Sequence, residues 1–423
     1  MADPGVDALV EDLFRRESAH LVSALVRLLG PSNLALAEDV VHDALLGAMH
    51  AWRFGVPDRP KAWILQVAKH RAIDALRRDR RLVPAARDDD DAPDRAPDHA
   101  VDQAVELALS PEADGENQLA MMFAICDPAL STETHVTLIL RLLCGLSSAE
   151  IARAFLVDAP TIDRRLHRGR ARLQALGELP DVSAAADLRA RQPSVEQALY
   201  LLFNEGYHGS AAEGPLHPAM CEDAIRLVEL LLEARGVAHA TVHALAALCC
   251  CTAARLATRL DGAGVLVPLA EQDRARWDRA LLERGVRHLA ASATGDHWTR
   301  WHLEAGIALE HTIAPSLAAT DWAKIVAYYD ALIALAPGPV VALNRGLAVA
   351  ELHGVEAGRA ALAALAGDPR LARYSFFWSA RADLDRRAGR AVEACAHYHR
   401  AVALARSAAE RGSYERRLRE LTP

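Results

Sequence analysis

Residues 158–173 read DAPTIDRRLHRGRARL and predict a short amphipathic helix. Asp158 is placed to accept a hydrogen bond from a first-turn amide, and Pro160 fits the first turn, where its missing N–H costs nothing. The predicted packing stripe recurs at helical spacing and contains Ile162, Leu166, Gly169 and Leu173. The opposite face carries Arg164, His167 and Arg168, with Arg165 and Arg172 on its flank. One face can therefore pack while the other meets phosphates and base edges.

The segment before it, LSSAEIARAFLV at 146–157, predicts a supporting helix. Ser147 and Glu150 have the S-x-x-E spacing of a capping box, and Ile151 and Phe155 repeat at i, i+4. Two helices with so short a connector are typical of a helix-turn-helix. From these residues alone, a DNA-reading helix and an ordinary solvated basic helix both stay open.

Composition favours an all-α protein. The chain has 423 residues, 52% of them hydrophobic but only 5% aromatic, and runs of β-branched residues are scarce. This length predicts two to four domains. The net charge of −8 conceals basic clusters at 77–81 and 164–172 and an acidic cluster at 88–91. Local basic patches on an acidic protein favour specific over indiscriminate nucleic-acid binding.

Several classes of function are not expected. The acidic N-terminus lacks a secretory signal and no apolar run looks long enough to span a bilayer, so we expect a cytoplasmic protein without membrane contact. The run Cys249–Cys251 lacks the spacing of a zinc site and is expected to pack in a core. No catalytic constellation, metal-ligand spacing or phosphate-binding loop is evident, so we expect no enzyme activity, cofactor or metal.

Two helices are predicted near the N-terminus. Residues 34–52 place Val41, Leu45, Ala48 and Trp52 on an inner stripe, and Asp39, Asp43, Leu46 and His50 opposite. An exposed leucine among acids indicates either a docking patch or an ordinary solvated face. After a loop at 54–60, the second helix places Leu65, Ala68, Ala72 and Leu76 on its packing face, and Trp63, His70, Asp74 and Arg77 on another. An aromatic ring beside polar and cationic groups is what single-stranded DNA binding needs.

The remaining segments are a linker and a large helical region. Residues 83–100 are acidic, proline-rich and without apolar periodicity, which predicts a spacer that could also occupy a nucleic-acid channel. Near the C-terminus, 326–337 resembles 395–406 at an offset of 69, and 339–354 resembles 374–389 at an offset of 35. These offsets favour tetratricopeptide-like helix pairs over a plain bundle, with a concave surface for a protein or peptide ligand.

Together these segments resemble bacterial sigma factors of the extracytoplasmic-function (ECF) type, over roughly residues 8–178. Residues 188–423 resemble the C-terminal extension of the subgroup with tetratricopeptide-like repeats. The resemblance implies an all-α chain divided into a region 2 domain at 1–82, an acidic linker at 83–102 and a region 4 domain at 103–180, followed by a helical extension at 188–322 and repeats at 323–423.

The resemblance also implies partners and site residues. Core RNA polymerase, through its β′ clamp helices and β flap, and promoter DNA would be the partners. The residues implied to contact polymerase are Asp39, His42, Asp43 and Leu46. Those implied at the −10 element are Phe54, Asp58, Trp63, His70, Arg71, Asp74, Arg77 and Arg78. Those implied at the −35 element are Thr161, Asp163, Arg164, Arg165, His167, Arg168 and Arg172. A helix-turn-helix regulator with a tetratricopeptide-like sensing domain is the alternative, and a repeat scaffold is a third interpretation.

Overall fold

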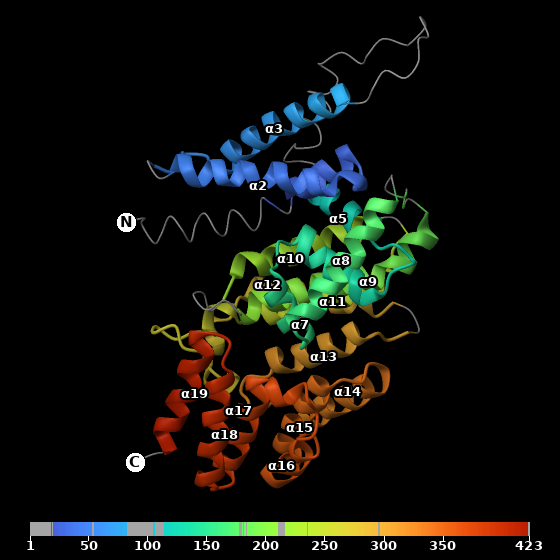
Figure 1. Cartoon of the computed structure of the whole chain (residues 1–423). Helices are drawn as coiled ribbons and strands as arrows, with labels where there is room; N and C mark the ends of the chain where they lie inside the picture. The colour runs from blue at the N-terminus through green and yellow to red at the C-terminus, as the bar shows by residue number, and fades with distance from the viewer. Residues whose placement is uncertain are drawn as a thin grey trace, which may run out of the picture. The chain divides into compact units, whose positions relative to one another are not determined.

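The computed structural model describes residues 18, 20–52, 55–82, 105, 114–176, 180, 182, 184–209, 216–234, 236–294 and 297–421. Within these ranges the chain is helical and forms no β-strand, which confirms the all-α prediction (Figure 1). A single antiparallel bridge joins Leu260 and Leu266 across a tight turn of the described chain. The chain divides into two compact units, of which the first comprises 1–152, 158–198 and 234–237.

The N-terminal part of the first unit is a pair of packed helices. Helix α2 spans Leu34–Ala51 and α3 spans Pro60–Leu82. The helix before them ends at Gly30, whose φ of 83° favours glycine. The predicted inner stripe of α2 is buried, including Leu45 and Trp52, and the Trp52 ring meets Trp63 edge-on with ring centroids 5.8 Å apart.

The predicted packing face of α3 needs a correction. Ala68 and Ala72 are buried as expected, but the face is completed by Ile64 and Ile73, while Leu65 is only half-buried. The side chain of Leu76 lies outside the described residues. The i, i+4 series that starts at Ile64 therefore faces α2, because Trp63 beside it rests against Trp52.

Five helical segments follow, all in the first unit except the end of the fourth, whose residues 153–155 belong to the second. They are α5 (Asp114–Ala124), α6 (Thr132–Leu138), a π-helical turn (Ile139–Leu143), α7 (Ser148–Phe155) and α8 (Ala159–Ala175). The predicted capping box starts α7: the Glu150 amide donates to Ser147 Oγ at 3.2 Å, and the Ser147 amide donates to Glu150 Oε2 at 2.7 Å. Asp158 caps α8 as predicted, accepting from the Thr161 amide at 3.1 Å. Leu156, between the two helices, has a φ of 54°.

Helix α9 (Ala185–His208) contributes to both units, because residues up to Ala198 belong to the first and later ones to the second. In the second unit, α11 (His239–Ala253) packs against α10 (Pro218–Glu233), α12 (Arg279–Ser292) and α13 (Arg300–Ile313). Cys249, Cys250 and Cys251 are buried in α11, and burial raises the pKa of the Cys251 thiol to about 11. These thiols therefore serve as packing groups in the core.

The expectation that no apolar run is long enough to span a bilayer is wrong by length and composition. The helical stretch His239–Thr258 has 20 residues and is long and apolar enough to cross a membrane. It is the one such helix among the residues that the structure describes. In the fold, 61% of its apolar window is buried by protein. Its apolar side chains are therefore accounted for by packing against the neighbouring helices of the second unit.

The C-terminal helices form the predicted repeats. They are α14 (Trp322–Leu335), α15 (Pro339–His353), α16 (Val355–Ala363), α17 (Ser375–Arg387), α18 (Ala391–Leu404) and α19 (Ala408–Leu421). Both α17 and α18 begin 36 residues after their counterparts α15 and α16. Helix α18 begins 69 residues after α14, which explains the sequence offset as two repeat periods. Figure 1 shows α17, α18 and α19 side by side.

Candidate nucleic-acid interface

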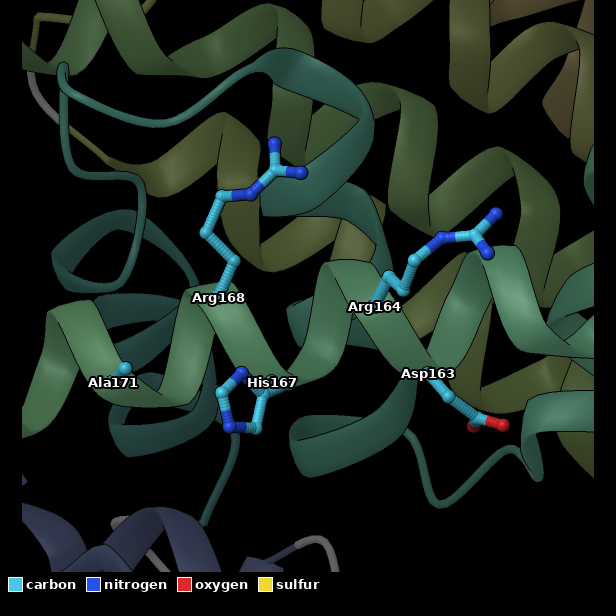
Figure 2. A pocket seen from close by; sticks show the side chains of 5 residues that line it. All are labelled: Asp163, Arg164, His167, Arg168 and Ala171. Carbon is cyan, nitrogen blue, oxygen red and sulfur yellow. The ribbon is translucent and has the colours of Figure 1, made fainter.

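The exposed face of α8 is a continuous polar strip formed by Asp163, Arg164, His167, Arg168 and Ala171. The strip surrounds a shallow recess, and Figure 2 shows Arg164 and Arg168 extending from one side of it and Asp163 and His167 from the other. Its position follows from the opposite stripe, since Ile162, Leu166, Gly169 and Leu173 are all buried as predicted.

The side chains of the strip are largely uncommitted. Among the described residues, Asp163, His167 and Arg168 make no side-chain hydrogen bond or ion pair. Arg164 and Arg168 are spaced i, i+4, so their like charges repel along the helix surface. An anion lying along the helix would relieve that repulsion, and a row of phosphates is such an anion.

The first turn of α8 organises one end of the strip. Thr161 Oγ1 donates to Asp158, and Arg164 Nη2 donates to Thr161 Oγ1 at 2.8 Å. The hydrogen bonds from the Thr161 side chain and amide lower the pKa of Asp158. The helix cap, Thr161 and Arg164 thus form one connected chain, which holds the Arg164 guanidinium near the start of the helix.

Other arginines of α8 are engaged within the first unit. Arg172 donates to Asp127 Oδ2 at 3.0 Å, and the Asp127 side chain is only 7% exposed. Arg170 donates to Glu38 Oε1 on α2 at 2.6 Å. Arg165 is half-buried on the flank of the helix. The structure therefore separates a strip that faces outward from arginines that seat α8 against its neighbours.

Close packing fixes the position of α8. A Cβ atom on Gly169 would lie 2.7 to 2.9 Å from three side-chain atoms of Leu138 on α6. Leu138 is fully buried, so its side chain has little room to move. Glycine at position 169 lets α8 approach α6 this closely.

The outer face of α2 carries the residues implied to contact polymerase. Asp39, His42 and Asp43 are exposed, and Leu46 is 39% exposed. Met49 is 47% exposed one turn beyond Leu46, so the apolar part of this face is larger than sequence reasoning expected. The i, i+3 spacing from Leu46 could have identified Met49.

The residues implied at the −10 element are only partly brought together. Arg71 donates to Asp43 Oδ2 at 2.7 Å, so one residue from each implied set shares an ion pair across α3 and α2. His70 and Asp74 are exposed, and the His70 ring lies 3.1 Å from Gln66 Nε2. Asp58 is exposed, whereas Trp63 is half-buried against Trp52. Phe54 and the side chains of Arg77 and Arg78 lie outside the described residues.

Three parts of the chain match known protein families. Residues 13–82 match Sigma-70 region 2, and residues 128–173 match Sigma-70, region 4. Residues 191–293 match a family of unknown function (DUF6596). An uncharacterized protein of Rhizobium meliloti (strain 1021) is 35% identical over 407 residues, which cover 92% of this chain and 92% of that relative. No solved structure matches the chain.

The two matched sigma regions coincide with the α2–α3 pair and with the helix-turn-helix of α7 and α8. A lone helix-turn-helix regulator does not account for the first of these, and a repeat scaffold accounts for neither. The chain belongs to the sigma-70 family as an ECF-type sigma factor, which binds core RNA polymerase and promoter DNA to initiate transcription and carries a C-terminal helical extension.

Proposed function

We propose that α8 reads the −35 element of the promoter from the major groove. The observation that supports this most directly is the outward strip of α8, on which the side chains of Asp163, His167 and Arg168 are free to meet base edges. Arg168 suits a guanine edge, to which arginine donates two hydrogen bonds, and Asp163 suits the amino group of cytosine. Thr161 and Arg164, tied to the helix cap, are placed to contact the phosphate backbone at the start of the helix.

The flanking arginines receive a different role in this proposal. Arg172 is held by Asp127 and keeps 42% of its side chain exposed, so it seats the helix and adds positive charge toward a phosphate. Arg165 contributes in the same way from its half-buried position. Loss of either charge would weaken binding to all sequences alike, since phosphate contacts carry no sequence information.

The first helices would provide the other half of the promoter contact. In this proposal Asp39, His42, Asp43 and Leu46 dock on the β′ clamp helices of polymerase, with Met49 extending the apolar contact. His70, Arg71 and Asp74 on α3, with Asp58 and Phe54 in the preceding loop, would hold unstacked bases of the −10 element. Trp63, Arg77 and Arg78 would supply an aromatic edge and backbone contacts. Capture of those bases offsets the cost of opening the duplex.

We further infer the domain division and a role for the extension. The proposed division places region 2 at 1–82, the acidic linker at 83–102 and region 4 at 103–180, where it would also contact the β flap. The extension at 188–423 would regulate the sigma regions in cis, with its repeats taking a protein or peptide ligand. The proposed location is the cytoplasm, where polymerase and promoter DNA are found.

Run-off transcription with purified core polymerase tests the promoter proposal. Arg168→Ala should weaken promoter binding by about 1–3 kcal/mol and alter the preference at one −35 base pair. The matched control is Arg226→Ala on α10, which removes the same charge from the extension. A uniform loss across promoter sequences would reduce Arg168 to a phosphate contact, and no transcription with the wild-type chain would overturn the −35 assignment.

A truncation tests regulation in cis. The cut should follow Val237, because the first unit includes the first part of α9 and residues 234–237. In α9, Arg191 donates to the Phe123 carbonyl at 2.9 Å, and Arg189 donates to the Gly236 carbonyl at 3.0 Å. Unchanged core affinity and unchanged promoter activity in a folded truncated chain would contradict a regulatory role. A change in either would support it.

A further inference from the structure

Two arginines that follow α11 carry charges without a carboxylate partner. Arg255 lies in the turn after α11, and Arg259 follows the 3-10 turn at Leu256–Thr258. Neither guanidinium makes an ion pair or side-chain hydrogen bond with any residue that the structure describes, and the Nε atom of each is buried without a partner. Both side chains are only partly buried, so their charges remain reachable from outside.

Both guanidiniums lie over the same aromatic ring. The central carbon of Arg259 is 4.2 Å from the centroid of the Tyr207 ring, and that of Arg255 is 5.9 Å from it. Tyr207 is 3% exposed, and its hydroxyl is buried without a hydrogen-bond partner among the described residues. The ring attracts both cations and so gathers them, but it carries no net charge to neutralise them.

Neighbouring groups add positive charge to this cluster. Arg274 donates to the carbonyl oxygens of His311 at 2.6 Å and Ala314 at 2.8 Å, and its Nη2 atom is buried without a partner in the described chain. Burial and the charges of Arg255 and Arg274 lower the pKa of His311 to about 4. The ring of His311 is therefore neutral at physiological pH, as expected in a field already crowded with cations.

The lack of counter-charge is local. Other arginines of the second unit have carboxylate partners: Arg406 pairs with Glu410 at 3.1 Å, Arg416 pairs with Asp261 at 3.4 Å, and Arg284 pairs with Glu229. Buried charges are ordinarily paired in this way, because desolvation without a partner is costly. Among the residues that the structure describes, no carboxylate pairs with the two arginines beside Tyr207, and an anion from outside the chain would supply the counter-charge.

We propose that Tyr207, Arg255 and Arg259 form a binding site for a phosphate monoester. Its two negative charges match two guanidiniums, whereas a single carboxylate would leave one of them uncompensated. Arginine forks suit phosphate oxygens, and the Tyr207 hydroxyl can donate a further hydrogen bond. All three residues lie within 191–293, the part that matches a family of unknown function, and none of them is among the residues proposed above to contact DNA or polymerase.

The test is a titration of the full chain with inorganic phosphate and with glycerol 2-phosphate, at constant ionic strength and pH 7.5. Isothermal calorimetry and thermal unfolding are the readouts. Both phosphates should bind saturably and raise the melting temperature, because a ligand that binds only the folded state stabilises it. Acetate at the same concentrations should produce no such rise. The absence of saturable phosphate binding would overturn the proposal.

Two pairs of substitutions separate the site from nonspecific binding. Arg255→Gln with Arg259→Gln should weaken phosphate binding by about tenfold to a hundredfold, and Tyr207→Phe should weaken it less. The control pair Arg226→Gln with Arg370→Gln removes the same charge from arginines that pair with Asp223 and Asp368, and should bind phosphate as the wild type does. Binding that persists in the first pair would mean an adventitious ion only.

Stability without phosphate gives a second readout. Arg255 and Arg259 repel one another and have no acidic partner in the described part of the chain, so the Gln pair should melt at the same temperature as the wild type or higher when no phosphate is present. A lower melting temperature combined with no phosphate response in the wild type would make the two arginines structural and overturn the proposal.

Discussion

Arg170 on α8 and Glu38 on α2 form an ion pair of 2.6 Å between segments 132 residues apart in the chain. Glu38 directly precedes Asp39, the first residue of the face proposed to dock on polymerase. The pair is partly solvated, since the two side chains are 35% and 30% exposed. Helix α8, which carries the strip proposed to read DNA, is therefore joined to the edge of the proposed polymerase-docking face.

The Glu38→Gln variant should be as stable as the wild type at pH 7, or slightly more stable. Burial raises the pKa of Glu38 above 4.5 despite the opposing charges of Arg170 and Arg141. The stability that Glu38 contributes is thus fully present below about pH 4.5 and lost as the pH rises through its folded pKa. Glutamine does not ionise and avoids this loss. Urea unfolding at pH 5 and pH 7 measures the free energy of unfolding of both proteins. If the variant is less stable than the wild type by more than about 1 kcal/mol at pH 7, the prediction is wrong.

Asp127→Asn provides a control of opposite sign. Burial alone would raise the pKa of Asp127, but hydrogen bonds from Arg172 and from the Ala129 amide lower it below 3.8. Its contribution to stability is present above about pH 3.8 and lost as the pH falls through the lower folded value. Asn should therefore destabilise the protein at pH 7, and the difference from the wild type should shrink in acid. Urea unfolding at pH 7 and at about pH 3, below the usual pKa of an aspartate, checks this.

Gly169→Ala should destabilise the first unit by about 1–3 kcal/mol, because the added methyl group meets the buried side chain of Leu138. Thermal unfolding measures the loss. Gly47→Ala in α2 is the matched control: its Cβ would meet only Trp63, at 3.9 Å, so the helical preference for alanine should stabilise the protein slightly. Leu138→Ala should reduce the effect of the Gly169 substitution, and equal effects in both backgrounds would rule out this contact as the cause.

Leu46→Glu should reduce affinity for core polymerase at least tenfold while leaving the melting temperature unchanged, since Leu46 is exposed and an acid there would lose the apolar contact. Surface binding to immobilised core enzyme measures the affinity. Val392→Glu on α18 makes the same chemical change at a residue that is 82% exposed in the extension. Equal losses in the two variants would argue against docking through α2.

Acid should weaken the fold through His311, whose folded pKa of about 4 lies below its usual value of 6.5. The unfolded chain takes up the proton first, so stability is constant above about pH 6.5 and falls as the pH drops toward 4. At about 1.4 kcal/mol per pKa unit, the full difference is roughly 3 kcal/mol. His311→Phe keeps a ring against Trp322 and should lose less stability between pH 7 and pH 5. If the wild type and the His311→Phe variant lose the same free energy of unfolding between pH 7 and pH 5, His311 is not the cause.

Local features of α8 and of the start of α7 could be predicted from sequence. The cap at Asp158, the capping box of Ser147 and Glu150, and the buried stripe ending at Leu173 all depend on residues three or four apart. Such contacts follow from helical geometry without knowledge of the fold. The repeat spacing near the C-terminus was accessible for a similar reason, because it reflects one helical unit used again.

Contacts between distant segments could not be predicted. Nothing in the pattern of α8 distinguishes Arg172, which pairs with Asp127, from Arg168, which stays uncommitted. The packing face of α3 was misjudged by one residue, because Ile64 and Leu65 are equally apolar and only the position of α2 decides between them. The cluster around Tyr207 was also missed, since Arg255 and Arg259 are about fifty residues away in the chain and reach Tyr207 from the turns that follow α11.

The first unit is discontinuous in sequence, and this has a consequence for synthesis. It includes the start of α9 and also residues 234–237, where the carbonyl of Gly236 accepts a hydrogen bond from Arg189 at 3.0 Å. Its last contacts therefore form only after the ribosome has released roughly the first half of the chain. The first unit of a nascent sigma factor therefore cannot finish folding until the start of the extension, through residue 237, has been translated.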